Sequence, residues 1–432
     1  MSQQLFSRSL SNSMVKSSPE CAPSVEEVIS NQDLLFEILL RVPVRSLMCL
    51  ILVSKQWLSL ITSNSFSILH RRRRRTTAIF LHSEFLLMKG YEHMKFIHLD
   101  LDCVNKNKNH RKFSSDNNPF RSSTFSHDPF YPKGVCVVQS CHGLLLCRSG
   151  ILVSKVNHHQ GLFYYYVYNP TTNQVVTIDR IWDSKIAIHA SVLCYEPAKA
   201  PYFKVVFCVN ISPEHNPKQR QIEIYTSETG TWKVSNLVPA PGLFTCYCAY
   251  FEGCIYWLTE ENTMCSYDVN EERQSTLPKP PRRRKFRLIR RYLYFGESAG
   301  HLHLAEVLPC ATSLDVYELN CDRSGWFLKY EVDLTRLAKV FPEMTNNKRT
   351  IDDEYAFAVL SLVRRREDFN EDSVLVLEIP GKVIVYNLVD QTCKVVWNFC
   401  EAKNARLWLC GIHKAMDYIE SLARVTTGSA CS

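Results

Sequence analysis

The hydrophobic positions of the chain follow two periods, one helical up to about residue 70 and one alternating beyond it. Between residues 34 and 61, nineteen of twenty-eight residues are apolar, and the only charged ones are Glu37, Arg41, Arg45 and Lys55. This apolar content is too high for helices that are exposed to water on all sides. The pattern predicts a small helical module followed by a large β-rich body.

Three short helices are expected in the module. Ser30 and Asp33 have the spacing of a capping box at the start of the first helix. Pro43 ends that helix and suits the first turn of a second helix over residues 44–53. Ser54 is placed to cap the third. The apolar face of the first helix consists of Leu34, Leu35, Ile38 and Leu39.

Such a module is too small to bury its own apolar surface. Domains of about 40 residues usually need a disulfide, a metal or a partner, and neither a disulfide nor a metal motif is visible in this stretch. The excess apolar surface therefore indicates a docking site for another chain, with helices packing against helices. The alternative is that the stretch only caps the domain that follows it.

The β-rich body contains a unit that recurs five times: a strand ending near a tyrosine, a polar turn, and another strand. The tyrosines are Tyr168, Tyr225, Tyr267, Tyr317 and Tyr386, separated by 57, 42, 50 and 69 residues. A propeller blade repeats every ~40–50 residues, which leaves room for insertions. Several hairpins also follow a strand led by a glycine, so that each repeat supplies about four strands. These glycines are Gly143, Gly253 and Gly300.

A sixth blade is expected from residues 77–82 paired with residues 406–412, which would close the ring and leave no exposed edge. The predicted fold is thus α+β and multidomain, a helical module followed by a propeller of about six blades. A pair of β-sandwiches is the alternative. Residues 102–132 are expected to form a surface loop. A final helix is predicted where four apolar residues share one helical face. They are Ile412, Met416, Ile419 and Leu422.

Two short motifs carry a family resemblance. Val42-Pro43-Val44 and Val53-Ser54-Lys55-Gln56-Trp57 resemble the F-box of plant F-box proteins, whose signatures are Leu-Pro-Val and Val-Ser-Lys-x-Trp. Ile29-Ser30 replaces the family's opening Leu-Pro, and Cys49 and Ile51 stand where basic residues are frequent. The resemblance implies that the module binds a Skp-type adaptor and, through it, the cullin and RING subunits of a ubiquitin ligase.

The same resemblance implies roles for individual residues. The residues expected to contact the adaptor are Leu34, Ile38, Leu39, Pro43, Val44 and Leu47. The residues expected to hold the three helices together are Trp57 and Leu60.

The resemblance continues into the body. SCHGLLLC, YVYNPTTNQ, YFEGCIYWL and VYELNCDRSGWFLKYEVDL are similar to the F-box-associated region of plant F-box proteins, a kelch-related repeat. It implies that the body captures a protein substrate, which the family does not share between members. The expected organisation is a tail over 1–27, the F-box over 28–70, a basic linker over 71–76, the propeller with its C-terminal helix over 77–425, and a tail over 426–432.

The amino-acid composition indicates in which cellular compartment the protein is expected. Apolar residues make up 46% and charged residues 22%, and the longest apolar run, from residue 47 to 53, is far below the roughly 18 residues of a membrane span. Eighteen cysteines without a Cys-x-x-Cys pair or a signal peptide indicate a reducing compartment, the nucleus or cytoplasm. Cys136, Cys141 and Cys147 are interpreted as buried thiols of the core. The serine-rich start of the chain is typical of a disordered tail, with a transit peptide as the alternative.

The net charge of +8 is concentrated in two basic blocks. One consists of Arg71, Arg72, Arg73, Arg74 and Arg75, and the other of Arg282, Arg283, Arg284, Lys285 and Arg287. Without them the remaining charge is 8 − 10 = −2. A nucleic-acid-binding propeller is therefore an alternative function, but no aromatic residue interrupts the first block to stack on bases, so a solvated linker is favoured.

Catalytic motifs are not found. Gly-x-Ser-x-Gly, His-Glu-x-x-His and phosphate-loop patterns do not occur. His301 and His303 would point to one side of a strand, which is half of a metal site, whereas the adjacent His158 and His159 would point apart. The acidic residues 352–354 fit a solvated loop. No cofactor, metal or catalytic residue is expected, and the chain is interpreted as a non-catalytic receptor subunit, with a propeller enzyme as a further alternative.

Overall fold

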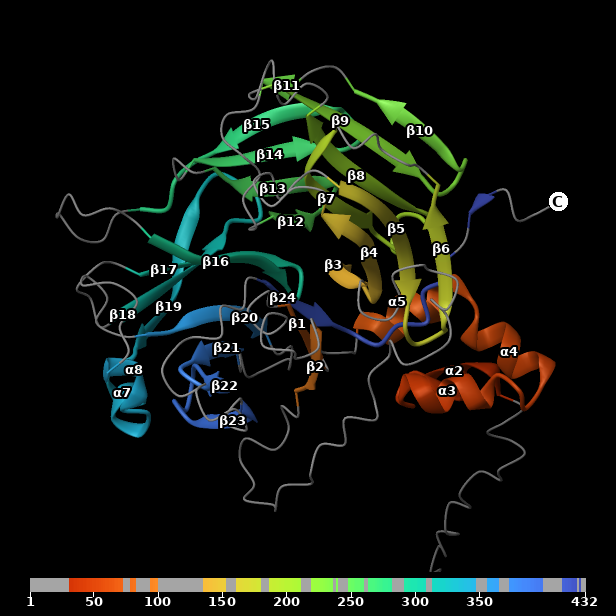
Figure 1. The fold of residues 1–432 in the computed structure, drawn as a ribbon. Coiled ribbons are helices and arrows are strands. Elements are labelled where there is room, and N and C mark those ends of the chain that lie inside the picture. Colours follow the sequence, from red (N-terminus) through yellow and green to blue (C-terminus); the bar gives the residue numbers. More distant parts are fainter. Residues whose placement is uncertain are drawn as a thin grey trace, which may run out of the picture.

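Figure 1 shows the fold of the chain in a computed structural model. Its described residues include a helical module of four short helices and a ring of six β-sheets beside it. The residues that the structure describes are 31–72, 78–82, 94–99, 135–152, 161–179, 186–210, 219–235, 238–239, 248–259, 263–281, 291–307, 313–346, 356–364, 373–398, 414–425 and 427–428.

The helices of the module start where the sequence offers a cap. The side chain of Asn31 accepts hydrogen bonds from the amides of Asp33 and Leu34, so Asn31 is the N-cap in place of Ser30, which lies outside the described residues. Pro43 precedes the second helix and the Ser54 hydroxyl accepts from the amide of Trp57, as predicted. The helices are α2 (Gln32–Leu39), α3 (Val44–Leu50), α4 (Lys55–Ile61) and α5 (Asn64–Arg72).

The fourth helix, α5, was not predicted. It begins three residues after α4 ends, and it includes Arg71 and Arg72, which had been assigned to the basic linker. Phe66 is fully buried, packs edge-on against Phe36 of α2, and stacks on His70. The Nε2 atom of His70 lies 2.9 Å from the carbonyl oxygen of Val42. Helix α5 therefore covers apolar surface that three helices would have left exposed.

The six sheets are the blades of a propeller, in agreement with the predicted fold. Blade 1 contains β3 (Cys136–Cys141), β4 (Leu144–Leu152), β5 (Gly161–Asn169) and β6 (Gln174–Ile178). Blade 2 contains β7 (Ala187–Tyr195), β8 (Phe203–Asn210), β9 (Gln219–Thr226), β10 (Thr231–Val234) and β11 (Val238–Pro239). Blade 3 contains β12 (Cys248–Phe251), β13 (Cys254–Leu258), β14 (Met264–Asp268) and β15 (Arg273–Leu277).

The remaining blades close the ring. Blade 4 contains β16 (Arg291–Ser298), β17 (His301–Val307), β18 (Ser313–Leu319) and β19 (Trp326–Asp333). Blade 5 contains β20 (Ala358–Arg364), β21 (Ser373–Ile379), β22 (Lys382–Asn387) and β23 (Cys393–Asn398). Two short helices, α7 (Thr335–Val340) and α8 (Glu343–Asn346), lie between blades 4 and 5 in the sequence. Blade 6 contains β24 (Lys414–Tyr418), β1 (Ala78–His82) and β2 (Met94–His98).

The predicted repeat corresponds to the third and fourth strands of each blade. The five repeat tyrosines, Tyr168, Tyr225, Tyr267, Tyr317 and Tyr386, lie on β5, β9, β14, β18 and β22, and all five are buried. A polar turn follows each of these strands before the outer strand begins, as expected from the sequence. The tyrosines mark equivalent positions in five blades because each one lies in the apolar cluster between its own blade and the preceding blade of the ring.

The closing strand differs from the prediction. Residues 414–418, predicted to be helical, form β24, which pairs antiparallel with β1 from Ala78↔Tyr418 to His82↔Lys414. Residues 406–412, predicted to be that strand, lie outside the described residues. The spacing of the apolar residues fits a helix. A strand, however, pairs with the backbone groups at the open edge of β1, and this tertiary pairing determines the structure of the segment.

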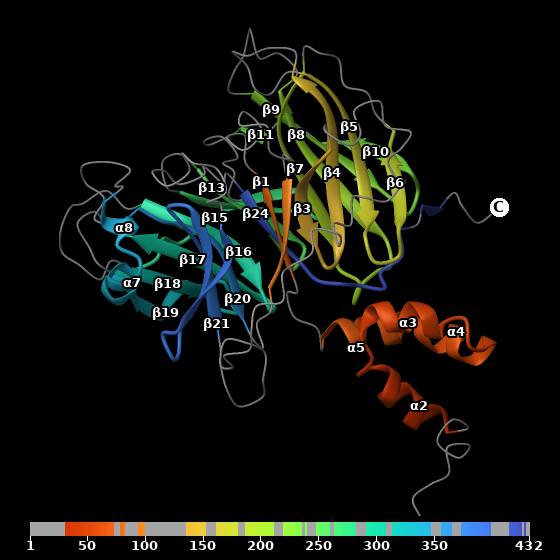
Figure 2. The same ribbon diagram turned by 60° about the horizontal axis from the view of Figure 1, so that its bottom comes forward.

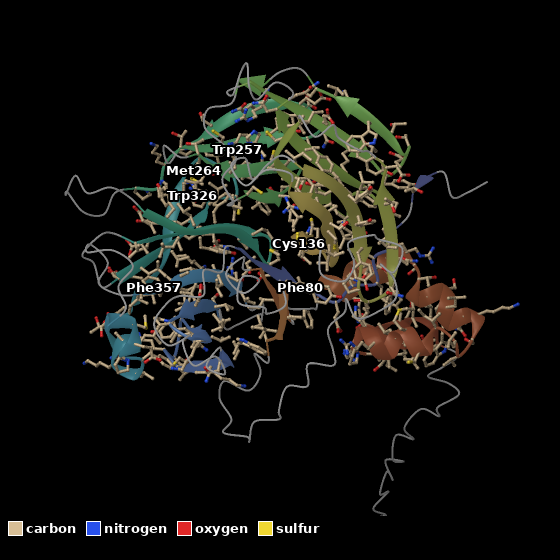
Figure 3. All side chains as sticks on the ribbon, viewed as in Figure 1. Phe80, Cys136, Trp257, Met264, Trp326 and Phe357 are labelled. Carbon is tan, nitrogen blue, oxygen red and sulfur yellow. The ribbon has the colours of Figure 1, made fainter. Side chains whose placement is uncertain are left out.

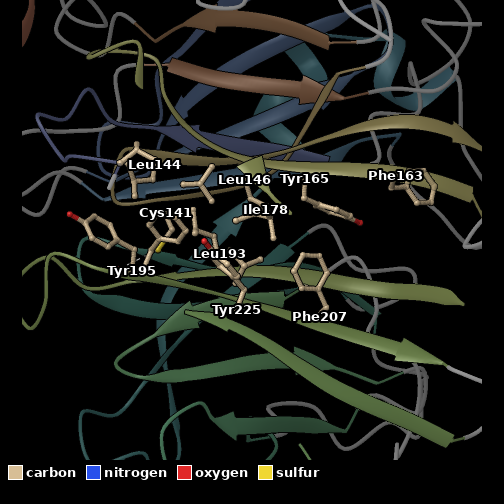
Figure 4. Close-up of a cluster of buried hydrophobic side chains, with 14 of the residues drawn as sticks. Cys141, Leu144, Leu146, Phe163, Tyr165, Ile178, Leu193, Tyr195, Phe207 and Tyr225 are labelled. Atoms are coloured by element: carbon tan, nitrogen blue, oxygen red, sulfur yellow. Dashed lines mark hydrogen bonds between the residues drawn. The ribbon is translucent and has the colours of Figure 1, made fainter. Parts of the chain in front are cut away.

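The first strands of blades 1 to 5 and β24 surround the centre of the ring, each in contact with its neighbours. Apolar clusters fill the spaces between adjacent blades, and residues such as Phe80, Trp257, Trp326 and Phe357 mark them around the ring (Figure 3). Between blades 1 and 2, Tyr165 meets Phe207 edge-on with ring centroids 4.8 Å apart (Figure 4). These clusters bury the apolar side chains of the propeller, and this burial is the main favourable contribution to its folding.

Candidate docking module and its attachment to the propeller

The six residues predicted to contact an adaptor divide into two sets. Leu34 and Ile38 project from α2 with 45% of each residue exposed, and Pro43 is also exposed. Leu39, Val44 and Leu47 are 0% exposed. In this structure the second set is covered by the chain itself, and Leu39 and Leu47 belong to the core cluster that also contains Phe66 of α5. Adaptor contact stays a prediction for all six residues.

Other exposed apolar residues lie near the turn between α3 and α4. Leu52 is 87% exposed, Val53 59% and Leu58 42%. These three residues were not among those predicted to contact an adaptor. A signal was nevertheless present, because the turn from Ile51 to Val53 contains no polar residue, although turns on a protein surface are usually polar.

The core of the module is compact. Leu60 belongs to it, and Trp57 packs against it while remaining partly exposed. Its buried members are Leu35, Leu39, Leu40, Leu47, Leu60, Ile61 and Phe66. One residue packed against this core comes from the other end of the chain: Leu422. The module is therefore attached to the propeller through side-chain packing.

The segment that carries Leu422 is residues 419–425, the C-terminal strap, which follows β24 directly. Its Glu420 carboxylate forms an ion pair with Arg45 of α3, with Oε1 and Nε 3.0 Å apart. Figure 2 shows the helical module lying below blade 1, where the chain of the strap passes. The strap thus lies between the module and the propeller.

Blade 1 holds the backbone of the strap. The Asn169 amide nitrogen donates to the carbonyl oxygens of Ser421 at 3.0 Å and Ala423 at 2.6 Å. The Thr171 hydroxyl lies 2.9 Å from the Tyr418 hydroxyl at the end of β24. Gly143, at a φ of +88°, leaves room for the strap, since a Cβ there would overlap Ser421. The glycine that the sequence pattern placed at the start of a strand thus permits this close approach.

The strap continues beyond blade 1. The amide of Gly428 donates to the carbonyl oxygen of Ser227 in blade 2 at 2.9 Å. Residue 428 lies in the range 426–432 that was predicted to be a disordered tail, and in the structure it contacts blade 2. The strap and residues 427–428 therefore pass along the ends of blades 1 and 2 at which their inner strands finish.

The two histidines predicted to share one side of a strand do so, and they meet a carboxylate. The Glu318 oxygens lie 3.0 Å from His301 Nδ1 and 3.2 Å from His303 Nε2. Arg364 of blade 5 approaches the same carboxylate at 3.2 Å. Burial acts to raise the pKa of Glu318, but the hydrogen bond to His303 and the electrostatic attraction of His301 and Arg364 outweigh it and lower this pKa to about 2. Within the described residues no group of metal ligands is found, and this cluster joins blade 4 to blade 5.

A second carboxylate, Asp417, lies on the closing strand β24. The Ser361 hydroxyl of β20 donates to it at 2.6 Å. Desolvation raises the pKa of Asp417 to about 7, with the Glu297 carboxylate acting in the same direction and the Ser361 hydrogen bond opposing both. The group therefore exchanges its proton near neutral pH at the seam between blades 5 and 6.

Replacing Asp417 by asparagine is expected to stabilise the protein at high pH. Because the folded-state pKa lies above the ordinary value of 3.8, wild-type stability falls as pH rises from about 3.8 through about 7. The asparagine amide would keep an acceptor for the Ser361 hydroxyl without ionising, so Asp417→Asn should gain on the order of 2 kcal/mol at pH 8 and little at pH 4. Urea unfolding at both pH values measures this, and an equal effect at both would contradict it.

The buried thiols agree with the sequence analysis. Cys136, Cys141 and Cys147 are all buried, and burial raises the pKa of the Cys147 thiol. Residues 73–75, 282–287, 158–159, 102–132 and 352–354, which include most of the basic blocks, lie outside the described residues. Among the described helices, none is long and apolar enough to span a membrane.

The described residues thus define a class of two-part proteins, in which a four-helix module with several exposed apolar residues is attached to a six-bladed propeller. Residues 31–69 match the F-box domain, and residues 119–350 match the model described as F-box protein At3g26010-like, beta-propeller. The chain is 31% identical to F-box protein At5g07610 of Arabidopsis thaliana over 91% of this chain and 92% of that protein. It is 25% identical to F-box protein At5g03970 of Arabidopsis thaliana over 58% and 57% of the two chains.

These matches show the family. The chain belongs to the plant F-box proteins with an At3g26010-like β-propeller. The F-box domain implies binding of a Skp-type adaptor. Proteins of this family are typically non-catalytic adaptors.

Proposed function

We propose that the protein is the substrate receptor of an SCF-type ubiquitin ligase. In this proposal the F-box binds a Skp-type adaptor, which connects it to the cullin and RING subunits, and the propeller captures a protein that is then ubiquitinated. The observation that supports it best is the outward-facing apolar surface of a module that matches the F-box domain. Leu34, Ile38 and Pro43 are the proposed adaptor contacts, with Leu52 and Leu58 as additional candidates.

The position of the module favours one end of the propeller for substrate capture. The strap leaves β24 and crosses Gly143, which follows β3, so it lies at the end where the inner strands finish. The F-box module lies at that same end, below blade 1 (Figure 2). The opposite end, where the inner strands begin, is therefore the proposed site for the substrate. A protein bound there would not collide with the adaptor.

In this proposal the receptor contributes no chemistry of its own. Holding a substrate near the ligase raises its effective concentration at the catalytic subunits, which turns a bimolecular encounter into a local one. This agrees with the absence of recognised catalytic motifs from the sequence. The nuclear or cytoplasmic location expected from the cysteines is part of the same proposal.

Charge placed on the exposed face of α2 is expected to abolish adaptor binding. Leu34→Asp combined with Ile38→Asp would bury two carboxylates in an apolar interface, so the affinity of the full-length chain for a purified Skp-type adaptor should fall at least about a hundredfold. Both side chains lie outside the module's core, so folding should be preserved. Isothermal titration calorimetry measures the affinity, and circular dichroism checks the fold.

The matched control is Val340→Asp, which changes an exposed apolar residue on the propeller insertion α7. It should leave adaptor affinity unchanged. If the α2 variant bound the adaptor as tightly as wild type, α2 would not be the docking face. If the wild-type chain bound no adaptor at all, the receptor function itself would be refuted.

A further inference from the structure

The C-terminal strap contacts the F-box module on one side and the propeller on the other. Toward the F-box, Glu420 pairs with Arg45 and Leu422 packs against the module's core. Toward the propeller, Asn169 holds the carbonyls of Ser421 and Ala423, the two residues that flank Leu422. Fixing the backbone on both sides of Leu422 fixes the direction in which its side chain leaves the strap. The strap is therefore anchored before it meets the F-box.

We propose that Arg45, Glu420 and Leu422 are positioning residues, which hold the F-box in one orientation relative to the propeller. The inference rests on the proposed receptor function, because it concerns the geometry between a docked adaptor and a captured substrate. The last strand of the ring, β24, runs directly into the strap. Closure of the propeller and placement of the F-box therefore depend on the same stretch of chain.

The two contacts make different contributions. The Arg45 side chain is 60% exposed and that of Glu420 20% exposed, so the ion pair by itself stabilises the arrangement weakly. Its effect is directional, since the charges attract only when α3 faces the strap. Leu422 adds burial of apolar surface, because it packs against the module's core. Together they favour one orientation without requiring a large interface.

A fixed orientation matters for ubiquitin transfer. The gain from tethering is greatest when the two bound partners are held at the productive distance, and it declines when they sample a wide range of distances. Loosening the strap should therefore reduce transfer to a bound substrate without weakening either binding step. This separation distinguishes a positioning role from a purely structural one.

The test uses the full-length chain with Glu420→Arg and, separately, Leu422→Ser. Small-angle X-ray scattering should show a larger maximum dimension and a broader distance distribution for both variants. Amide hydrogen exchange in α3 should accelerate about fivefold, the order expected for losing a weak surface ion pair and gaining a repulsion. Adaptor affinity and the melting temperature of the propeller should stay at wild-type values, because neither residue lies on the proposed docking face or in a blade core.

A charge exchange provides the rescue. Arg45→Glu combined with Glu420→Arg restores attraction with reversed polarity and should return the scattering profile to that of wild type. The matched control is Glu271→Arg, at an exposed glutamate on a turn of blade 3, and it should change nothing. Unaltered scattering and exchange in both strap variants would overturn the proposal. The orientation measurement needs no adaptor, so its failure is distinct from the failure of the proposed function.

Discussion

A chain that ends at residue 413 is expected to lose its folded propeller. It would lack β24, the inner strand of blade 6, leaving β1 without its central partner. Met416 and Tyr418 would also be missing from the cluster between blades 6 and 1. Burying two such side chains stabilises by about 4 kcal/mol, and the lost strand pairing adds to this. A typical domain has only about 5–15 kcal/mol in total, so cooperative folding should fail.

Thermal unfolding followed by circular dichroism measures this, together with gel filtration to detect aggregation through the exposed strand edges. The control is a chain that ends at residue 428, which keeps β24, the strap and the contact between Gly428 and Ser227. It should melt like the full-length protein. A cooperative transition at the wild-type temperature in the shorter chain would show that β24 is dispensable for closure.

Glu318→Gln is expected to destabilise the protein by about 3 kcal/mol at pH 7, since removing one member of a buried charged group leaves its partners uncompensated. The buried carboxylate joins His301 and His303 of β17 to Arg364 of β20. Arg364 would keep its charge near the seam between blades 4 and 5 without this carboxylate opposite it. Urea unfolding of both proteins at pH 7 measures the loss.

The pH dependence provides an independent check on Glu318. Its folded-state pKa lies near 2, below the ordinary value of 4.5, so its contribution is complete above about pH 4.5 and disappears as pH falls through about 2. The stability difference between wild type and Glu318→Gln should therefore shrink as pH is lowered from 5 toward 2. A difference that stayed constant over this range would show that the carboxylate is not held in its charged form. Glu271→Gln, an exposed change, should have no effect at any pH.

Much of the architecture could be predicted from the sequence because the propeller repeats itself. Each repeat carries a tyrosine on its third strand, and the spacing of residues such as Tyr168 and Tyr317 reports the blade size even where loops differ in length. Closure by the N-terminal strand could also be anticipated, since a ring without exposed edges needs a strand for every gap. For the repeat tyrosines and for the N-terminal strand, the structure expected from the local hydrophobic pattern is the one that the closed ring requires.

Prediction failed where two structures fit one local pattern. Met416, Ile419 and Leu422 match a helical face, but Met416 lies on a strand and Leu422 on the strap. Leu39 is buried in a core that includes Phe66 of α5, a helix whose polar composition hid its covering role. The pattern around an individual residue does not reveal which distant segment will cover it.

The contacts of the candidate site were the least predictable part. Arg45 meets Glu420 across 375 residues of sequence, and Glu318 meets Arg364 from another blade. Such pairs leave no periodic signal, because each partner resembles an ordinary surface charge. The pairing of His301 with His303 was predictable in part, since alternate residues of a strand share a side, whereas the carboxylate between them was not.

Ring closure has a consequence for biosynthesis. The central partner of β1, β24, is translated more than 330 residues after it, so blade 6 stays incomplete until every other blade has been translated. The F-box precedes every blade and emerges from the ribosome before them. An adaptor could therefore engage the nascent polypeptide before any substrate-binding surface exists, and truncated translation products would carry an F-box without a finished receptor.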